Sequence, residues 1–372
     1  MICLPGASTD NLLRLPALGD ALELREVADR AAGGAPEPDY AQGVGRAFLA
    51  VLTSAVAGCG GSSLGADAGN VAIDAAGSGA STTLASSGWP YAIAVDSTHV
   101  YWTDSIAYTV MKAPLGGGPP VTLASNQDNV WAIAVDATNV YWTLRPIRTV
   151  GAVMTVPLEG GTPVTIASGQ MYPETLAVDG THVYWTATGD GTIMKAPRGG
   201  GLPVTVASGQ DSPYKVVVDA TAVYWTNVGE TGGPEVGTGS VMMVPLAGGD
   251  PVALASAQRS PYDIAVDGDS IYWTTYGPSL SEAFVMKMPL SGGTPTTLAS
   301  VGRITTLQPM VVDATGIYWA PQPGGIVRVS KSGGAPIPLW PPGTNVVALA
   351  VDQTRVYWAE QLPGAVRSIA KP

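Results

Sequence analysis

Acid-base catalysis depends most often on histidine, and the chain has only two histidines, His99 and His182. Each follows an Asp-x-Thr sequence, at 96–98 and 179–181, which is typical of a tight turn. A nucleophilic serine on a sharp elbow is not indicated either, because no Gly-x-Ser-x-Gly occurs between a strand and a helix. These residues therefore identify no catalytic centre.

Carboxylates recur at one fixed place in a longer pattern, Val-Asp-x-x-x-Val/Ile-Tyr-Trp. Aspartates can bind metal ions, but in a turn the side chain more commonly accepts hydrogen bonds from nearby backbone N–H groups. We therefore expect turn-capping aspartates, no metal site and no cofactor. The seven copies contain Asp96, Asp136, Asp179, Asp219, Asp267, Asp313 and Asp352.

The copies of this pattern lie 39 to 48 residues apart, which is the length of one four-stranded blade of a β-propeller. In the first copy, short runs bounded by turn residues predict strands at 92–96, 100–103, 110–114 and 121–125, named a to d in order. Abundant glycine (47) and proline (31), with 13% charged residues, agree with strands and turns. The sequence therefore predicts an all-β fold, a seven-bladed β-propeller over residues 81–372.

The two ends of the repeat region predict how the ring closes. A strand-d sequence at 82–86 precedes the first a-b-c unit, and the last unit, which ends at Lys371, has no strand d after it. We expect the N-terminal strand to complete the C-terminal blade, which removes two exposed sheet edges.

Other repeated residues have structural interpretations. Paired glycines after strand c predict tight turns with positive φ, not phosphate loops, because no helix follows them. A methionine of strand c is expected to pack between blades, as are the seven tryptophans, each with a local partner for its indole N–H. The pairs begin at Gly117, Gly160, Gly200, Gly248, Gly292 and Gly333, and the methionines are Met111, Met154, Met194, Met242 and Met286.

The segment before the repeats resembles a bacterial lipoprotein signal peptide. Arg46 precedes an apolar run at 47–57, and Val56-Ala57-Gly58-Cys59 matches the sequence around the lipidated cysteine of that class. The run is shorter than the roughly 20 residues that span a bilayer; an ordinary buried helix is the alternative. The resemblance implies lipidation at Cys59 and a place in the bacterial cell envelope, in the periplasm or at the outer surface, with the membrane reached through the N-terminal lipid only.

This interpretation divides the chain into a leader with signal peptide at 1–58, a flexible Gly/Ser/Ala tether at 59–80 and the propeller. Signal peptides begin near the N-terminus, so Val44 is a candidate for the true start of translation. The alternative is a cytoplasmic leader with a short amphipathic helix at 12–32.

The tetrapeptide at 101–104 is Tyr-Trp-Thr-Asp, and later copies read YWTL, YWTA, YWTN, YWTT, YWAP and YWAE. The repeats thus resemble the YWTD class of propellers found in low-density-lipoprotein-receptor ectodomains, and related bacterial propeller lipoproteins. The receptor propellers have six blades and this chain has seven signatures, so the resemblance is one of blade type. It implies an extracytoplasmic binding scaffold and transfers no ligand or site residue.

Because strands alternate in direction, the a-b and c-d turns share one face of the disc, and the b-c and d-a loops share the other. Only the second face varies from blade to blade, and variable loops on a rigid scaffold commonly carry binding groups. Its longest b-c loops are expected at 227–239 and 275–283, with Glu230, Glu235 and Glu282.

Aromatic and polar side chains on this variable face are the candidate ligand-binding residues. Large rigid rings suit a sugar face or an extended peptide; the alternative is that they plug the channel mouth. Three polar candidates are expected at the same place near the start of strand a in successive blades: Glu174, Lys215 and Asp263. The aromatic candidates are Trp89, Tyr91, Trp131, Tyr172, Tyr214, Tyr262 and Tyr276.

The net charge of the chain limits the classes of partner that it is expected to bind. A net charge of −11 with only 18 Lys and Arg argues against nucleic acid, which requires basic surfaces. We expect a monomeric, non-catalytic propeller that binds a glycan, a peptide or an envelope protein. The alternative is a propeller enzyme, since seven-bladed propellers include lyases of the streptogramin type and six-bladed ones include lactonases. A third class is a scaffold for an envelope complex.

Overall fold

The computed structural model describes residues 80–372 except 148, 230–236, 278–281, 303–308 and 322–324. The chain separates into two units, Met1–Ala68 and Gly69–Pro372, and all the described residues belong to the second. The predicted signal peptide, Cys59 and nearly all of the tether therefore lie outside the described residues. No helix in the described part is long and apolar enough to cross a membrane.

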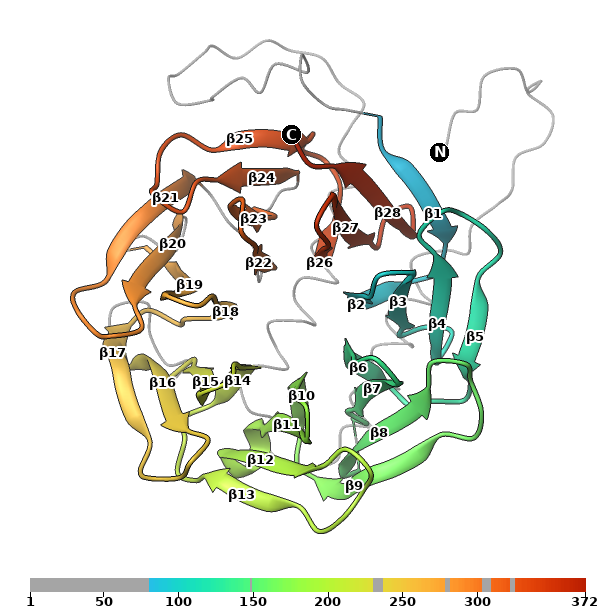
Figure 1. The fold of residues 1–372 in the computed structure, drawn as a ribbon, viewed down its shortest axis with the longest axis horizontal. Coiled ribbons are helices and arrows are strands. Elements are labelled where there is room, and N and C mark those ends of the chain that lie inside the picture. The colour runs from blue at the N-terminus through green and yellow to red at the C-terminus, as the bar shows by residue number, and fades with distance from the viewer. Residues whose placement is uncertain (1–79, 148, 230–236, 278–281, 303–308, 322–324) are drawn as a thin grey trace, which may run out of the picture. The chain divides into compact units, whose positions relative to one another are not determined.

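The described strands form seven four-stranded antiparallel sheets arranged around a central channel (Figure 1). The seven-bladed, almost entirely β architecture predicted from the repeats is confirmed. A single 3-10 turn, η1 (Thr188–Asp190), interrupts the strands of the described residues.

In each blade strand a lies next to the channel and strand d at the rim. Blade 1 consists of β2 (Pro90–Val95), β3 (His99–Asp104), β4 (Thr109–Pro114) and β5 (Val121–Ala124). Blade 2 consists of β6 (Val130–Val135), β7 (Asn139–Leu144), β8 (Gly151–Pro157) and β9 (Val164–Gln170). Blade 3 consists of β10 (Pro173–Val178), β11 (His182–Ala187), β12 (Thr192–Pro197) and β13 (Val204–Ala207). Blade 4 consists of β14 (Pro213–Val218), β15 (Ala222–Asn227), β16 (Gly239–Pro245) and β17 (Val252–Gln258).

The remaining blades follow the same order. Blade 5 consists of β18 (Ile264–Val266), β19 (Ser270–Tyr276), β20 (Glu282–Pro289) and β21 (Thr296–Gly302). Blade 6 consists of β22 (Met310–Val312), β23 (Ile317–Trp319), β24 (Ile326–Val329) and β25 (Ile337–Trp340). Blade 7 consists of β26 (Val346–Val351), β27 (Arg355–Glu360), β28 (Ala365–Ala370) and β1 (Thr82–Ser86).

Strand β1 supplies the outer strand of blade 7, although it is the first strand of the chain. It pairs antiparallel with β28, and Arg367 Nη1 donates to Thr83 Oγ1 at 2.9 Å. Leu84 and Ala85 are buried in the cluster that joins blade 7 to blade 1. The N-terminal and C-terminal ends of the repeat region are thus held in one sheet.

The Tyr-Trp pair of strand b fills the spaces between blades. Successive side chains of a strand point to opposite faces, so the two rings pack toward different neighbours. Tyr101 of blade 1 and Trp142 of blade 2 lie in one buried cluster, and both are at most 1% exposed. Burying such large rings stabilises the contact between two blades.

A local partner for the indole N–H is found for six of the seven strand-b tryptophans in the described part of the chain. Trp142 Nε1, for example, donates to Gln127 Oε1 at 3.1 Å, and that glutamine is oriented by its own bond to the Ser125 carbonyl. Trp319 has no such partner. The other paired tryptophans are Trp102, Trp185, Trp225, Trp273 and Trp358.

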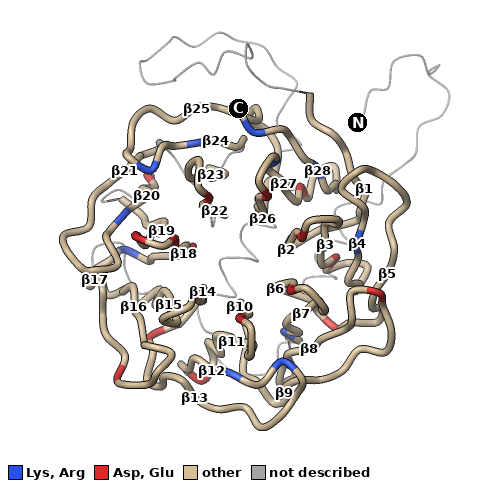
Figure 2. The backbone as a smooth tube through the Cα atoms, in the orientation of Figure 1, with Lys and Arg blue, Asp and Glu red and all other residues tan. Residues whose placement is uncertain are grey.

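The repeated aspartates cap the a-b turns, as predicted. Asp96 Oδ1 accepts from the backbone N–H groups of Thr98 and His99 at 2.6 and 2.7 Å, and Oδ2 accepts from the Tyr101 hydroxyl at 2.7 Å. Burial alone would raise the pKa of Asp96, but these hydrogen bonds outweigh burial and lower it. Acidic residues accordingly lie around the central opening, next to β2, β6, β10, β22 and β26 (Figure 2).

The residue that follows strand c links each blade to the preceding one. Leu158 packs on the preceding blade's Tyr101, whereas Lys331 donates to the preceding blade's Asp267 at 2.7 Å. Arg198 and Lys371 bond in the same way to Asp136 and Asp313. The same position thus makes apolar contacts in some blades and ionic contacts in others.

The glycine pairs form tight c-d turns with positive φ, as predicted; Gly117 and Gly118 have φ of 88° and 145°. The strand-c methionines are partly buried against clusters between blades, for example Met154 beside Tyr101 and Trp142. Both features are structural.

Removing β1 should destabilise the propeller severely, because β28 would lose its partner and two buried side chains would leave the core. Deletion of residues 81–86 should lower the free energy of unfolding by more than about 3 kcal/mol, and Leu84→Ala alone by about 2 to 4 kcal/mol. The matched control is Leu202→Ala, since Leu202 is 88% exposed. Urea unfolding followed by circular dichroism measures these differences, and an unchanged midpoint for the deletion would refute the closing role of β1.

Candidate functional site

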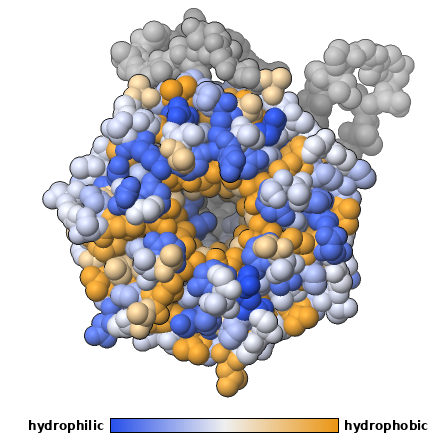
Figure 3. Space-filling model, in the orientation of Figure 1, coloured by the Kyte–Doolittle hydropathy of each residue, from blue (hydrophilic) through white to orange (hydrophobic). Residues whose placement is uncertain are grey.

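Backbone hydrogen bonds define the two faces of the disc. On one face a-b and c-d turns meet, as where Leu115 N donates to Thr98 O at 2.9 Å. On the other, d-a and b-c loops meet, as where Ser105 N donates to Trp89 O at 3.2 Å. We call these the turn face and the loop face. Apolar surface gathers around the central opening in the view of Figure 3.

Both histidines lie on the turn face. His99 and His182 are the first residues of β3 and β11, directly after the a-b turns. Their Nδ1 atoms lie 2.8 and 2.7 Å from the hydroxyls of Thr98 and Thr181. Each is therefore part of its turn and distant in the fold from the loop face.

Threonines of the Tyr-Trp-Thr sequence position the start of strand a. Thr103 Oγ1 accepts from Ala92 N of its own blade at 3.1 Å and donates to Trp131 O of the next blade at 3.0 Å. The same bridge runs from Thr186 to Tyr214 O at 2.9 Å and from Thr226 to Tyr262 O at 2.8 Å. These bonds fix the backbone of the residues that carry the candidate rings.

We call the first group of rings the Trp131 cluster: Tyr91, Trp131, Arg145, Tyr172 and Glu174, contributed by blades 1 to 3. The ring centroids of Tyr91 and Trp131 are 4.2 Å apart. The Arg145 guanidinium lies 4.9 Å from the centre of the Trp131 ring and 5.2 Å from that of Tyr172. A guanidinium stacked between two rings is held firmly and gains cation-π attraction from both.

Glu174 lies beneath this stack and is fully buried. Arg145 Nη2 is 3.0 Å from Glu174 Oε1. Burial raises the pKa of Glu174 from its usual 4.5 to about 7, and it outweighs the opposing effects of the Arg145 charge and the Trp131 side chain. A ligand on the surface would sense Glu174 only through Arg145.

The expectation that Glu174 shares a position with Lys215 and Asp263 is wrong by one residue. In blade 3, Leu176 pairs with Trp185, and in blade 4, Val216 pairs with Trp225. Glu174 therefore corresponds to Tyr214 and precedes the Lys215 position. Because side chains alternate along a strand, Glu174 points toward the preceding blade, where Arg145 lies.

Tyr172 has an unusual backbone conformation. Its φ is 51°, in the left-handed region that costs most residues about 1 kcal/mol or more and that asparagine tolerates better. The same loop position is Asn129 in blade 2 and Ser212 in blade 4, with φ of 52° and 54°. The loop geometry is thus common to these blades, and a tyrosine in it is explained by what its ring contacts.

We call the second group the Tyr262 cluster: Tyr214, Lys215, Tyr262, Asp263 and Tyr276, from blades 4 and 5. The Tyr262 ring is 5.5 Å from Tyr214 and 5.7 Å from Tyr276, nearly edge-on to both. Burial raises the pKa of Tyr276 despite its hydrogen bond with Tyr262. All three rings are half-buried and keep part of their surface in solvent.

The charged pair of this cluster, Lys215 and Asp263, has a structural role. Lys215 Nζ lies 3.5 Å from Asp263 Oδ1, while Asp263 Oδ2 accepts from Met310 N of blade 6 at 2.8 Å. Asp263 therefore ties two blades together, and Lys215 is the more exposed partner.

Trp89 stands apart from both clusters. It is half-buried, and its backbone N–H donates to Asp104 Oδ2 at 3.1 Å. That aspartate, the last residue of the YWTD tetrapeptide, also accepts from Ser87 Oγ at 2.6 Å and from the backbone of Ala107 at 2.9 Å. It organises the loops of blade 1 and is only 2% exposed.

Arg145 was missed by the sequence analysis. The only available signal is its place directly after the fourth residue of the YWTL copy, where blade 1 has Ser105 and blade 3 has Thr188. Glu282 is exposed at the start of β20, and the predicted loop residues Glu230 and Glu235 lie outside the described residues.

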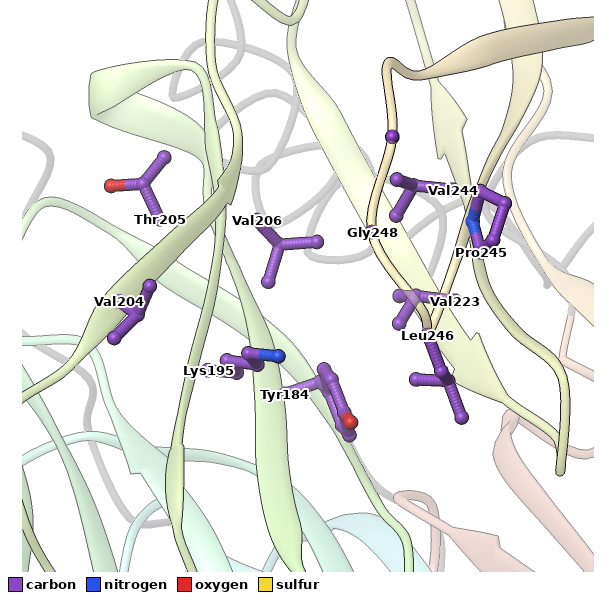
Figure 4. A pocket seen from close by; sticks show the side chains of 11 residues that line it. Tyr184, Lys195, Val204, Thr205, Val206, Val223, Val244, Pro245, Leu246 and Gly248 are labelled. Carbon is purple, nitrogen blue, oxygen red and sulfur yellow. The ribbon is translucent and has the colours of Figure 1, made fainter.

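A small hollow of about 160 Å³ lies elsewhere, between blades 3 and 4 near the turn face. Figure 4 shows Tyr184, Lys195, Val206 and Leu246 around it. Its lining is mostly aliphatic, and it shares no residue with either cluster. Among the residues that the structure describes, no group of His, Cys, Asp or Glu is arranged to hold a metal ion.

No protein-family model matches the sequence, and neither does any curated protein. The fold defines the class, a seven-bladed β-propeller protein. A streptogramin B lyase is 11% identical with a TM-score of 0.62, over 78% of this chain and 96% of that chain. A catalytically inactive virginiamycin B lyase from Staphylococcus aureus with quinupristin is 12% identical with a TM-score of 0.61, over 79% and 99%.

A propeller of another kind is the chain from a nidogen/laminin complex, 17% identical with a TM-score of 0.51 over 66% of this chain and 94% of that chain. The expected likeness to the YWTD class and to other propellers is confirmed at the level of the fold. At these identities the similarities show the fold alone, and they include both enzymes and a binding protein.

The pKa of Glu174 predicts a pH dependence of stability. Its folded pKa of about 7 lies above the usual 4.5, so between these values the unfolded chain releases this proton first and stability falls as pH rises. From pH 5 to pH 8, the wild type should lose about 1 to 3 kcal/mol of unfolding free energy relative to Glu174→Gln.

Urea unfolding of both proteins at the two pH values measures this difference. Glu282→Gln serves as the control, because Glu282 is exposed and its replacement should leave the pH dependence unchanged. If Arg145 instead kept Glu174 ionised throughout, wild type and Glu174→Gln would change in stability by nearly the same amount between pH 5 and pH 8, because the carboxyl would be ionised in both the folded and the unfolded chain.

Proposed function

We propose that the protein is a non-catalytic binding propeller whose loop face holds a ligand, with glycans and peptides the favoured classes. The observation that carries this proposal is the pair of aromatic clusters at the inner ends of five consecutive blades. Half-exposed tyrosine and tryptophan side chains provide contact area at low cost in conformational entropy. Their backbones are fixed by threonine bridges, which reduces the entropy lost on binding.

The residues that recur among the repeats make hydrogen bonds that stabilise the fold. The aspartates cap turns, and the glutamines and threonines hold tryptophan N–H groups and neighbouring strands. Side chains at the loop-face positions differ from blade to blade and are not needed for these bonds. This separation supports a role for the loop face in recognition.

An enzyme of the lyase or lactonase type is the second candidate. Two structural neighbours are lyases, and one of them is a catalytically inactive variant in which a histidine is replaced by alanine. Among the described residues of the loop face, Glu174 has a pKa raised to near neutrality, a property common at catalytic sites. Its complete burial behind Arg145 favours a positioning role over proton transfer to a ligand.

We further propose that Cys59 is lipidated and tethers the propeller to a membrane of the bacterial cell envelope. The apolar run at 47–57, which ends in a small-residue sequence before the cysteine, supports this. A monomeric propeller on a flexible Gly/Ser/Ala tether would present the loop face to a glycan, a peptide or an envelope protein. The acidic balance of the chain argues against nucleic acid.

The central experiment compares the two faces. Glycan and peptide arrays would first identify a ligand, and Trp131→Ala or Tyr214→Ala should then weaken binding by at least about 1 kcal/mol, because both remove anchoring rings. His99→Ala and His182→Ala on the turn face should leave the dissociation constant unchanged. An activity abolished by a histidine replacement, with the ring variants unaffected, would move the working face to the opposite side.

Anchoring is tested separately. Cys59→Ala should abolish acyl labelling and release the protein from the membrane fraction, because stable attachment depends on the lipid chains. Starting the gene at Val44 should leave export intact. Equal membrane retention of wild type and Cys59→Ala would rule out the lipoprotein interpretation.

A further inference from the structure

We infer that the ligand of the loop face is a linear, uncharged oligosaccharide that lies along an arc formed by blades 1 to 5. This inference rests on the proposed binding function and names the ligand class. It follows from the recurrence of aromatic rings along the arc, the pairing of its charged side chains and the chemistry of the side chains that form it.

The arc consists of corresponding residues in five consecutive blades. One position near the start of strand a lies at the same distance before the turn aspartate in each of these blades. The residues at this position are Tyr91, Trp131, Glu174, Tyr214 and Tyr262. In blades 2 to 5, a threonine of the preceding blade donates to the carbonyl of this residue, with Thr143 Oγ1 to Glu174 O at 3.4 Å as the longest bond. Four of the five side chains are aromatic, so ring surfaces recur from blade to blade.

The arc ends where aromatic residues no longer occur at this position. In the sequence, the corresponding residues of blades 6 and 7 are Gln308 and Val347. Val347 of blade 7 takes the place that Tyr91 has in blade 1, since Leu349 pairs with Trp358 as Ile93 pairs with Trp102. The ring platform is therefore one-sided, which suits a chain laid along it better than a compact ligand centred on the channel.

Each cationic side chain of the arc lies next to a carboxyl group. Arg145 is paired with Glu174, and Lys215 with Asp263. A charged ligand would have to compete with one of these contacts, at the cost of leaving a partly buried partner uncompensated. A neutral ligand leaves both pairs intact.

Sugar units can interact with both the aromatic and the cationic side chains of the arc. The C–H faces of a pyranose ring can stack on tyrosine and tryptophan, and its hydroxyls can accept hydrogen bonds from the guanidinium and ammonium groups at the edges of the arc. The guanidinium of Arg145 is held between Trp131 and Tyr172, so it is presented in one orientation. The unfavourable φ of Tyr172 agrees with retention of that ring for recognition.

Exposed aliphatic side chains also lie on the loop face, and they allow a glycan ligand to be distinguished from a peptide. Ile147 is 79% exposed and Met171 is 38% exposed, both on loops outside the arc. A peptide with apolar side chains would cover such residues to gain burial energy. A glycan on the arc would leave them in solvent, so they distinguish the two ligand classes.

The test uses isothermal titration calorimetry of the full chain with neutral homo-oligosaccharides from disaccharide to hexasaccharide. The series contains β-1,4-linked glucose, β-1,4-linked N-acetylglucosamine and α-1,4-linked glucose. For at least one series, affinity should rise with chain length, because a longer chain reaches both clusters. Trp131→Ala and Tyr214→Ala should each weaken hexasaccharide binding about tenfold or more.

Three matched variants serve as controls. Ile147→Ser and Met171→Ser alter the exposed aliphatic residues, and Val347→Ala alters the corresponding strand position outside the arc; none should change glycan affinity. Trp131→Leu keeps apolar bulk without an aromatic face, and it should bind as weakly as Trp131→Ala.

The outcomes separate the inference from the proposed function. Binding of peptides but not neutral glycans, with losses in Ile147→Ser or Met171→Ser, would overturn the inference and leave the binding function standing. Affinity that does not depend on chain length would also overturn the inference. Binding of no probe of either class would count against both.

Discussion

The packing of one tyrosine and one tryptophan on opposite sides of strand b is the contact on which the rest of the structure depends. A single four-stranded sheet cannot bury both faces by itself, and each Tyr-Trp pair gives a blade a buried contact with two neighbours. Repetition of that pair around a circle fills every interblade space with rings that are nearly or fully inaccessible to solvent.

Strand b also determines what the remaining residues do. The Tyr101 hydroxyl bonds to the turn aspartate, the Trp102 N–H to the end of the preceding strand d, and Thr103 to the next strand a. One short sequence thus fixes the turn face, the rim and the channel lining together. The loop-face side chains take little part in these bonds, so they are free to differ between blades without loss of the fold.

Much of the fold could be predicted from the sequence because its determinants are local and repeated. A few neighbouring residues are enough to identify the turn aspartates, the glycine pairs and the strand at 82–86 that completes the last blade. For the candidate site, the sequence predicted only the face of the disc on which it lies. Arg145 gave no repeated signal, and the burial of Glu174 arises from a neighbouring blade that is distant in sequence.

The error of one residue at Glu174 has a different origin, because the sequence holds the correct register. A proline directly precedes Glu174, Tyr214 and Tyr262, and these three residues lie at the same distance before their turn aspartates. The pairing of Leu176 with Trp185 agrees with this alignment. The strained backbone of Tyr172, in contrast, is a property of the loop that the residue type does not predict. Loop conformation therefore had to come from the structure.

The pairing of β1 with β28 separates the start and the end of folding in time. These strands lie at opposite ends of the described chain, so the blade they share cannot form until every other blade has been synthesised. Until then, β1 remains an unsatisfied strand that another copy's last blade could capture. Exchange of this strand between two crowded chains would give a dimer in which each ring is closed by its neighbour. A low local concentration of newly made chains would disfavour this exchange.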